Sequence, residues 1–308
     1  MKIAFFGTAD FGIEALKAIL SSRHEISAVI TNPPKPAGRG LKVCKSPINV
    51  FAEERGVSPI FTPESTKDES FIEELKKIEA DLFVVVAFSI LPKAVFSIPK
   101  HGTYNIHAAL LPAFRGPAPI QRAIESGARK TGVSVFRIDA GVDTGDIVLQ
   151  KECEIHPLDD TPALYEKLSV LGASALIDAL DKIADGEVEY KSQDKNSATK
   201  APLLKKGEAI IKWSESNVQI LNKIRAFKPF PNSCTSISGE QIIIEKAKIS
   251  DGNGGKIGEI VQLDKDGIYV QTGDGILQIC ELKPAGKRTM SARDYINGKH
   301  IKEGIVLG

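Results

Sequence analysis

Apolar residues follow two patterns along the first half of the chain. Continuous apolar runs predict buried strands, and runs with apolar residues every three or four positions predict helices. Strands are expected at Lys2–Phe6, His24–Thr31, Asp81–Ala87, Gly102–His107 and Thr131–Ile138. Helices are expected at Phe11–Ser21, Ile48–Arg55, Glu69–Ile78, Ile120–Glu125 and Thr161–Asp185. This alternation predicts an α/β domain whose mostly parallel sheet is covered by helices on both faces.

The pattern changes after residue 189. Residues 190–206 have no periodicity and are rich in Lys, Ser and Asn, which is typical of a linker. A helix at Val218–Phe227 is followed by short strands with Gly/Asp turns, which predict a small antiparallel barrel or sandwich. These strands are Gln241–Ala247, Gly258–Leu263, Gly267–Thr272 and Gly275–Glu281. We therefore expect an α/β domain at 1–189, a basic linker at 190–206 and a β domain at 207–308.

Composition and cysteine spacing narrow the class of protein. Hydrophobic residues make up 42% and charged residues 26%, which is typical of a globular chain and excludes disorder. The four cysteines form no Cys-x-x-Cys pair, which argues against a zinc site or a disulfide framework. The N-terminus lacks a signal-peptide pattern, and no apolar stretch reaches the roughly 18 residues of a membrane span. We expect a cytoplasmic protein with no membrane partner and no bound metal.

The glycines after the first strand form no standard nucleotide motif. Gly7 and Gly12 are separated by four residues, whereas the dinucleotide fingerprint has the spacing GxGxxG. A P-loop would have lysine where this chain has Ile13. The turn is predicted to be structural, or to line a cleft at the strand ends. A nicotinamide-dependent oxidoreductase is therefore disfavoured.

Three polar residues follow predicted strands near the middle of the chain. Asn105 and His107 lie two residues apart, so they share one face of their strand. Asp143 lies in the Gly-bracketed turn after the next strand, and we expect it at the same carboxyl edge of the sheet. An amide can donate to an oxyanion, and an imidazole beside a carboxylate can carry a proton, which together suit acyl transfer. No Ser or Cys lies between them, so a covalent acyl-enzyme is not expected; a structural histidine and a plain turn are the alternative interpretation.

Short motifs throughout the chain resemble those of one family. They are Phe6-Gly7-Thr8, Pro36–Gly40, Asn105-Ile106-His107, Leu110-Leu111-Pro112, Arg115-Gly116, Ala118–Gln121, Gly141–Asp146, Ile224–Pro231, Thr272–Gly275 and Pro284–Lys287. In this order they resemble the folate-dependent formyltransferases over nearly the whole chain. The resemblance implies a Rossmann-like, mostly parallel sheet of the formyltransferase fold in a catalytic domain at 1–189. It also implies an OB-like β-barrel at 207–308 that binds tRNA.

The resemblance also implies a reaction. The methionine amine of charged initiator tRNA would attack the formyl carbon of 10-formyltetrahydrofolate, a substrate and not a tightly bound cofactor. Asn105 and His107 would stabilise the tetrahedral oxyanion, while Asp143 would orient or charge the imidazole and assist proton removal through water. The protein is expected to act as a monomer. The residues implied to bind folate are Phe88, Ser89, Ile90, Leu91, Pro92, Ala109, Leu110, Leu111, Pro112, Ile138 and Asp139.

Two departures from the family pattern lie in this expected folate pocket. Ala109 stands where the family usually has Ser, and the segment 87–92 is one residue shorter than its counterpart. Both concern the contacts with the pterin ring. The three expected catalytic residues match the family pattern.

Basic residues are concentrated in three segments. The total charge is only +1, but 32–47 and 283–293 contain no acidic residue, and 191–206 has five Lys against one Asp. Each segment alone is typical of a solvated loop, whereas the three together fit a track that contacts phosphates. The predicted tRNA contacts are Lys35, Arg39, Lys42, Lys205, Lys206, Lys287 and Arg288. The family resemblance suggests that the Arg39 loop inserts at the acceptor end.

Other functions remain open at this point. A formyltransferase acting on a small amine, such as a nucleotide or an amino sugar, would share the Asn–His–Asp site without needing the basic segments. A hydrolase of 10-formyltetrahydrofolate would also share the site. A non-catalytic RNA-binding protein on the same scaffold is disfavoured, because all three site residues are present.

Overall fold

The computed structural model describes residues 1–37 and 42–308, and their contacts divide into two compact units. The first unit contains 1–119, 130–154 and 165–201, and the second contains 120–129, 155–164 and 202–308. The second unit therefore includes two short pieces from the first half of the sequence. The domain boundaries at 189 and 206 stay predictions.

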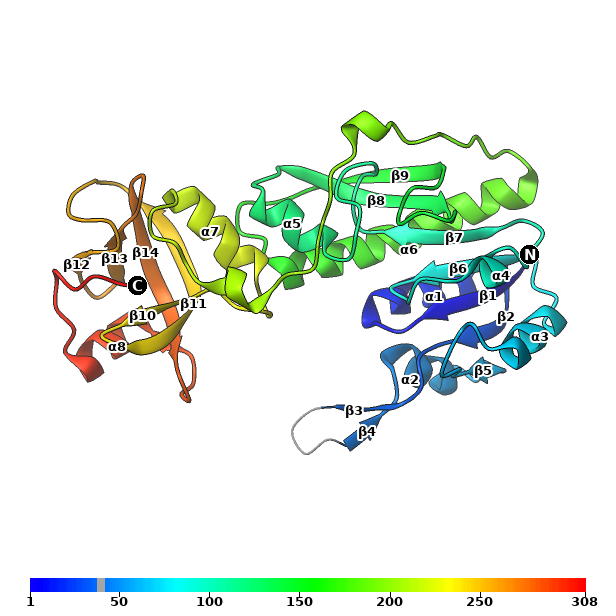
Figure 1. Ribbon diagram of the computed structural model, residues 1–308, viewed down its shortest axis with the longest axis horizontal. Coiled ribbons are helices and arrows are strands. Elements are labelled where there is room, and N and C mark those ends of the chain that lie inside the picture. The colour runs from blue at the N-terminus through cyan, green and yellow to red at the C-terminus, as the bar shows by residue number, and fades with distance from the viewer. Residues whose placement is uncertain (38–41) are drawn as a thin grey trace. The chain divides into compact units, whose positions relative to one another are not determined.

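A seven-stranded sheet is the centre of the first unit (Figure 1). Its strands are β1 (Lys2–Gly7), β2 (Glu25–Ile30), β5 (Ile60–Phe61), β6 (Leu82–Val86), β7 (Thr103–His107), β8 (Lys130–Arg137) and β9 (Ile147–Glu154). They run in the order β5-β2-β1-β6-β7-β8-β9. The first five are parallel, whereas β8 and β9 are antiparallel to their neighbours. The prediction of a mostly parallel sheet is confirmed.

Helices cover both faces of this sheet. They are α1 (Ile13–Leu20) after a 3-10 turn at Asp10–Gly12, α2 (Pro47–Glu54), α3 (Glu69–Lys77), α4 (Lys93–Phe96) and α6 (Thr161–Asp185). On one face, β1, β2 and β6 pack on α3 and α4 around Phe6, Phe83 and Leu75. On the other face, Gly172 of α6 lies close to Ile106 of β7. Each buried strand therefore reads as a continuous apolar run because both of its faces are covered.

Strands β3 (Lys35–Ala37) and β4 (Lys42–Cys44) form a separate two-stranded sheet. They pair antiparallel, with Lys35 opposite Cys44. This hairpin did not emerge from the hydrophobic pattern, because Lys35, Pro36 and all three residues of β4 are exposed. Arg39, one of the predicted tRNA contacts, lies outside the described residues.

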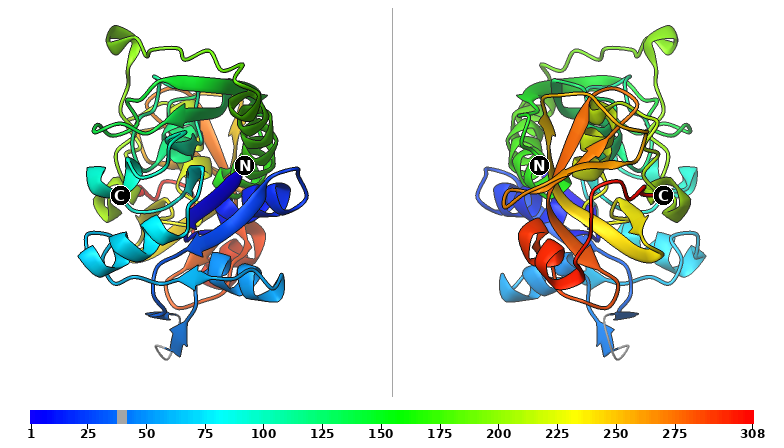
Figure 2. Two further views of the ribbon diagram at one scale, coloured as in Figure 1. Left: turned by 90° about the vertical axis from the view of Figure 1, so that its right-hand side faces the viewer. Right: turned by 90° about the vertical axis from the view of Figure 1, so that its left-hand side faces the viewer.

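The second unit is built on a six-stranded antiparallel sheet. Its strands are β10 (Cys234–Ile237), β11 (Glu240–Ser250), β12 (Ile260–Leu263), β13 (Ile268–Gln271), β14 (Ile276–Pro284) and β15 (Met290–Ser291). The main path is β10-β11-β14-β13-β12, with β15 paired to β14, and the right-hand panel of Figure 2 shows it as a curved sheet. The helices are α5 (Pro119–Glu125), α7 (Asn217–Ala226) and α8 (Ala292–Lys299), with 3-10 turns at Lys195–Ser197 in the first unit and Lys206–Ala209 in the second. The predicted antiparallel β domain is confirmed.

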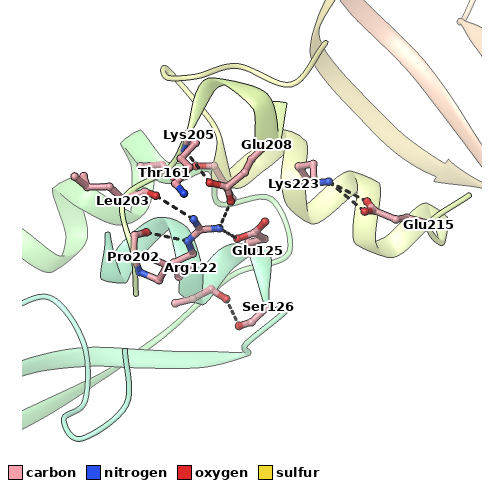
Figure 3. Close-up of polar contacts among 12 residues, drawn as sticks. Arg122, Glu125, Ser126, Thr161, Pro202, Leu203, Lys205, Glu208, Glu215 and Lys223 are labelled. Carbon is pink, nitrogen blue, oxygen red and sulfur yellow. Dashed lines mark hydrogen bonds and ion pairs between the residues drawn. The ribbon is translucent and has the colours of Figure 1, made fainter. Parts of the chain in front are cut away.

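Helix α5 is fixed to the second unit by a cluster of charges around Arg122 (Figure 3). Its guanidinium pairs with Glu125 at 2.7 Å and with Glu208 at 2.8 Å. It also donates to the carbonyls of Pro202 and Leu203. Because the Arg122 side chain is only 13% exposed, these charges are partly shielded from water. The segment 202–208 is therefore held against α5.

No helix in the ranges 1–37 and 42–308 is both long and apolar enough to cross a membrane. The longest one, α6, packs on the sheet of the first unit through Gly172.

Candidate active site

Strand β7 places Asn105 and His107 on the sheet face opposite α6. Ile106, between them, points toward Gly172 of α6, so its two neighbours point the other way. Asn105 pairs with Val85 of β6, and His107 pairs with Ser134 of β8. The two side chains therefore lie at the carboxyl end of β7, where open α/β sheets bind ligands.

His107 is held by one backbone carbonyl and one carboxylate. Its Nε2 lies 2.8 Å from the Phe114 carbonyl oxygen, to which it donates, and its Nδ1 lies 3.7 Å from Asp143 Oδ2. The side chains of His107 and Asp143 are only 6% and 13% exposed. Burial lowers the pKa of the His107 imidazole below its usual value, while Asp143 and the Phe114 carbonyl oppose that shift. Because Nε2 carries the proton donated to Phe114, Nδ1 is the nitrogen that gains or loses a proton beside the carboxylate.

Asp143 reaches His107 by a route that differs from the sequence expectation. Because β8 is antiparallel to β7, its carboxyl end lies beside the start of β7, where Arg137 is opposite Tyr104. The loop 138–146 instead returns along the sheet and brings Asp143 back to His107. The expected proximity is therefore present, but the shared carboxyl edge that we gave as its reason was wrong.

The loop around Asp143 has a narrowly defined shape. Asp143 has a φ of 54°, a left-handed conformation that is uncommon for a residue with a side chain. Its Oδ2 accepts a hydrogen bond of 2.8 Å from the Gly116 N–H. A Cβ on Gly145 would lie 1.7 Å from the Arg137 carbonyl oxygen, so only glycine fits there. The glycine explains part of the GVDTGD motif in steric terms.

Asn105 has a buried oxygen that has no protein partner. Its Oδ1 makes no hydrogen bond with any other described residue. Buried polar atoms are normally satisfied, so an unpartnered one marks a place where a ligand or water can bind. An amide here can donate through Nδ2 and accept through Oδ1 at the same time.

The loops expected to bind folate have mixed environments. Ala109 is fully buried, and its carbonyl accepts from Ser134 Oγ at 2.7 Å. Leu111 is also buried, whereas Leu110 is half-buried. In the segment 88–92, Ile90 is 81% exposed and Phe88 packs edge-on against Phe6. Ala109 and Leu111 therefore support the loop from inside, which leaves the role of this loop in folate binding a prediction.

A cavity of about 610 Å³ opens beside the Asp143 loop. Two predicted folate-binding residues, Ile138 and Asp139, line this cavity. Lys93, which directly follows the predicted segment 88–92, also lines it. Asp139 accepts from the Gly141 N–H and from Thr144 Oγ1, so its carboxylate is engaged in shaping the loop. The other lining residues are Phe96, Ser97, Ile98, Pro99, Lys100, Gly102, Thr103, Arg137, Ala140, Gly145 and Asp146.

The predicted tRNA contacts occur in both units. Lys35 and Lys42 lie on the exposed β3–β4 hairpin of the first unit. In the second unit, Lys205 and Lys206 adjoin the Arg122 cluster, and Lys287 and Arg288 lie in the exposed turn between β14 and β15. None of these six forms an ion pair within the part of the chain that the structure describes.

Sequence reasoning missed one residue that supports the site. Gln193 lies in the segment predicted as a linker, and its amide contacts the Asp143 loop and Arg115. No periodicity or motif marks it, because its partners, two backbone carbonyls and the Arg115 guanidinium, lie far away in the sequence. Across 1–37 and 42–308, no group of three or more His, Cys, Asp or Glu could hold a metal ion.

The fold and the site together define a class of enzyme. Residues 1–180 match the family described as formyl transferase, and residues 203–300 match its C-terminal domain. This chain belongs to the formyl transferase family. It is therefore a formyltransferase whose two matched regions cover both halves of the sequence.

The solved structures with a similar fold belong to proteins with different names and substrates. HypX from Aquifex aeolicus in complex with tetrahydrofolic acid aligns with a TM-score of 0.66 and 17% identity, covering 96% of this chain and 47% of that chain. This chain thus spans about half the length of HypX. An N-formyltransferase from Helicobacter canadensis, in complex with folinic acid and dTDP-3-aminofucose, gives 0.66 and 19%, covering 94% and 100%. Methionyl-tRNA formyltransferase from Clostridium thermocellum gives 0.55 and 20%, covering 81% and 94%.

Proposed function

We propose that this chain is a methionyl-tRNA formyltransferase. It transfers the formyl group of 10-formyltetrahydrofolate to the methionine amine of charged initiator tRNA. The observation that carries the reaction type is the placement of Asn105 and His107 on one face at the end of β7, with Asp143 Oδ2 3.7 Å from His107 Nδ1. The choice of acceptor is supported by the similarity to a methionyl-tRNA formyltransferase and by the exposed cations Lys287 and Arg288 of the second unit.

The site residues suit direct attack by an amine. The amine nitrogen forms a bond to the formyl carbon, and the formyl oxygen becomes an oxyanion in the tetrahedral intermediate. Asn105 Nδ2 can donate to that oxyanion, and Asn105 Oδ1 can accept from the attacking amine, because the protein leaves this atom unpartnered. The bond between the formyl carbon and N10 of the folate then breaks.

His107 and Asp143 handle the proton and the charge in this mechanism. Because Nε2–H is committed to the Phe114 carbonyl, Nδ1 is the nitrogen available to the substrate. Burial disfavours a proton on Nδ1 in the free enzyme, and the oxyanion forms only during the reaction. An imidazolium is therefore stabilised mainly in the intermediate, as catalysis requires. The amine loses one proton through water toward Asp143, and this proton is delivered to N10 as the bond between the formyl carbon and N10 breaks.

The folate is assigned to the cavity beside the Asp143 loop. Its lining combines apolar side chains, such as Phe96 and Ile138, with polar backbone groups of the loop. Related enzymes are named as complexes with tetrahydrofolic acid or folinic acid, which supports a folate donor here. The donor is consumed in the reaction, so no tightly bound cofactor is required.

The acceptor is tested by direct competition between substrates. The protein is incubated with 10-formyltetrahydrofolate and, separately, charged initiator tRNA, charged elongator tRNA or a dTDP-amino sugar. We expect formylation of the initiator tRNA alone, and none with a His107→Ala variant. Formylation of the sugar and not the tRNA would assign the chain to the sugar enzymes. Formate released at the same rate without any acceptor would indicate a hydrolase.

A further inference from the structure

The segment 190–201, which we call the strap, is hydrogen-bonded to both loops of the active site. At one end, the backbones of Lys191 and Ile147 exchange two bonds of 2.9 Å beside the Asp143 loop. At the other end, Ala201 N–H donates to the Arg115 carbonyl at 2.7 Å, and Arg115 N–H donates to the Thr199 carbonyl at 2.9 Å. The strap therefore connects the loop that carries Asp143 with the loop that carries Phe114, the backbone partner of His107.

Gln193 makes this connection with a single side chain. Its Nε2 donates to the carbonyl oxygens of Asp143 at 3.0 Å and Gly145 at 2.7 Å. Its Oε1 accepts from Arg115 Nε at 3.0 Å and from Arg115 Nη2 at 2.6 Å. Only an amide offers two donors and an acceptor at this length, so neither Glu nor Leu can make the same set.

These bonds act on both sides of the Asp143 carboxylate. The carbonyl that Gln193 holds belongs to Asp143 itself, whose left-handed backbone needs support from its surroundings. The residue that Gln193 holds through Oε1 is Arg115, which directly precedes the Gly116 N–H that donates to Asp143 Oδ2. Gln193 thus fixes the acceptor and the donor of the bond that aims the carboxylate at His107.

We propose that Gln193 is a positioning residue for formyl transfer, which keeps the Asp143 carboxylate beside Nδ1 of His107. It touches neither of these two side-chain groups and acts through the backbone of the Asp143 loop and through Arg115. Loss of its two donors lets the loop relax, and the carboxylate then moves away from the imidazole. The inference rests on the proposed function only for its kinetic readout.

The first test needs no acceptor. The imidazole of His107 is titrated by NMR in the free full-length protein, with its signal assigned by comparison with His107→Asn. Asp143 raises the pKa of His107, so its displacement should lower this pKa in Gln193→Leu, which adds no charge, and to a smaller extent in Gln193→Glu, whose new carboxylate opposes the change. An unchanged His107 titration in both variants overturns the proposal, whatever the substrate of the enzyme proves to be.

The second test separates positioning from stability. With charged initiator tRNA as acceptor, both Gln193 variants should lower kcat by about 10- to 100-fold, with KM for the tRNA within about threefold. The matched control is Gln278→Leu, which removes a buried glutamine that donates to the Asp266 carbonyl in the second unit. This control should lower Tm without changing the His107 titration or kcat. The proposal would be overturned if Gln278→Leu, at an equal loss of Tm, lowered kcat as much as the Gln193 variants do. The loss of kcat would then reflect stability alone.

A wild-type protein that formylates no tRNA would count against the proposed function alone. The NMR comparison would still decide the role of Gln193. If Gln193→Leu does not fold, Gln193→Glu provides both readouts, because it retains the acceptor for Arg115.

Discussion

The candidate catalytic residues and the candidate tRNA contacts of this protein are held in opposite ways. His107 and Asp143 are nearly buried, and each is fixed by a backbone group, Phe114 O for one and Gly116 N–H for the other. Lys287 and Arg288 are exposed, and neither forms an ion pair within the described ranges. Chemistry requires groups placed within a fraction of an ångström, whereas phosphate binding requires only that positive charge be near.

This difference predicts how substitutions should behave. A change at the buried site disturbs a fixed geometry, so its effect should be large and should appear in kcat. A change among exposed cations removes one of several weak attractions, so its effect should be small, should appear in KM and should depend on salt. The first three predictions below each test one side of this contrast, and the fourth concerns a buried histidine outside both regions.

The largest effect is expected from His107→Ala. Without the imidazole, the oxyanion loses a partner and the amine proton loses its route, so kcat should fall about 10³-fold. The measurement is formylation of charged initiator tRNA, with Kd for the tRNA determined in parallel. Kd should stay within about twofold of wild type, and near-normal turnover would remove His107 from the mechanism.

The next effect is expected from Gly145→Ala. The added Cβ would lie 1.7 Å from the Arg137 carbonyl, so the Asp143 loop must shift. We expect a loss of kcat of about 10- to 100-fold and a destabilisation of about 1–3 kcal/mol. The control is Gly298→Ala, because a Cβ there meets nothing within 4 Å. Equal kinetics in the two variants would show that the loop tolerates the shift.

A smaller effect is expected from the double variant Lys287→Ala/Arg288→Ala. KM for charged tRNA should rise about tenfold, with kcat within about twofold, and the slope of log KM against log salt should fall by about two. The charge-matched control is Lys265→Ala/Lys302→Ala, two exposed lysines of the same unit. If both double variants change KM equally, total charge rather than location determines the binding.

The smallest effect concerns stability and pH at His24. Burial, then the Met1 ammonium, lowers the pKa of His24 below 6.5, despite Asp181 at 3.2 Å. The unfolded chain therefore binds a proton more readily, so the free energy of unfolding should decrease as pH falls below about 6.5. His24→Gln should flatten this dependence, measured by urea denaturation between pH 5 and 8. An unchanged pH dependence would mean that His24 does not contribute.

Most strands and helices of the first unit could be predicted from the sequence, because the patterns that define them lie within short segments. The apolar runs of β1 and β6 are continuous since both faces of the sheet are covered, and the spacing of Asn105 and His107 follows from the period of a strand. The pairing direction of β8 was not readable, because an antiparallel strand buried on both faces has the same apolar pattern as a parallel one. Asp143 was thus identified by its motif, while its path to His107 required the structure.

The supporting residues of the site were not readable from the sequence. Gln193 lies among Lys, Ser and Asn, and its importance comes from carbonyl groups about 50 residues earlier in the chain. In the basic segments, by contrast, the sequence overstated the importance of some residues. Lys45 belonged to a basic segment, but it pairs with Glu53 at 2.6 Å and so contributes less free charge than its position suggested. A count of charges cannot distinguish such a lysine from an unpaired one.

The strap also has a consequence for synthesis of the protein on the ribosome. The last strand of the seven-stranded sheet ends at Glu154, so all strands of that sheet can pair early in translation. The loops bearing Phe114 and Asp143 still lack their hydrogen bonds to Gln193 and Thr199 at that stage. A nascent chain that stops before residue 190, where the strap begins, would therefore contain a folded sheet with a loosely held site. Catalytic competence should appear late in translation, well after the sheet on which the site is built.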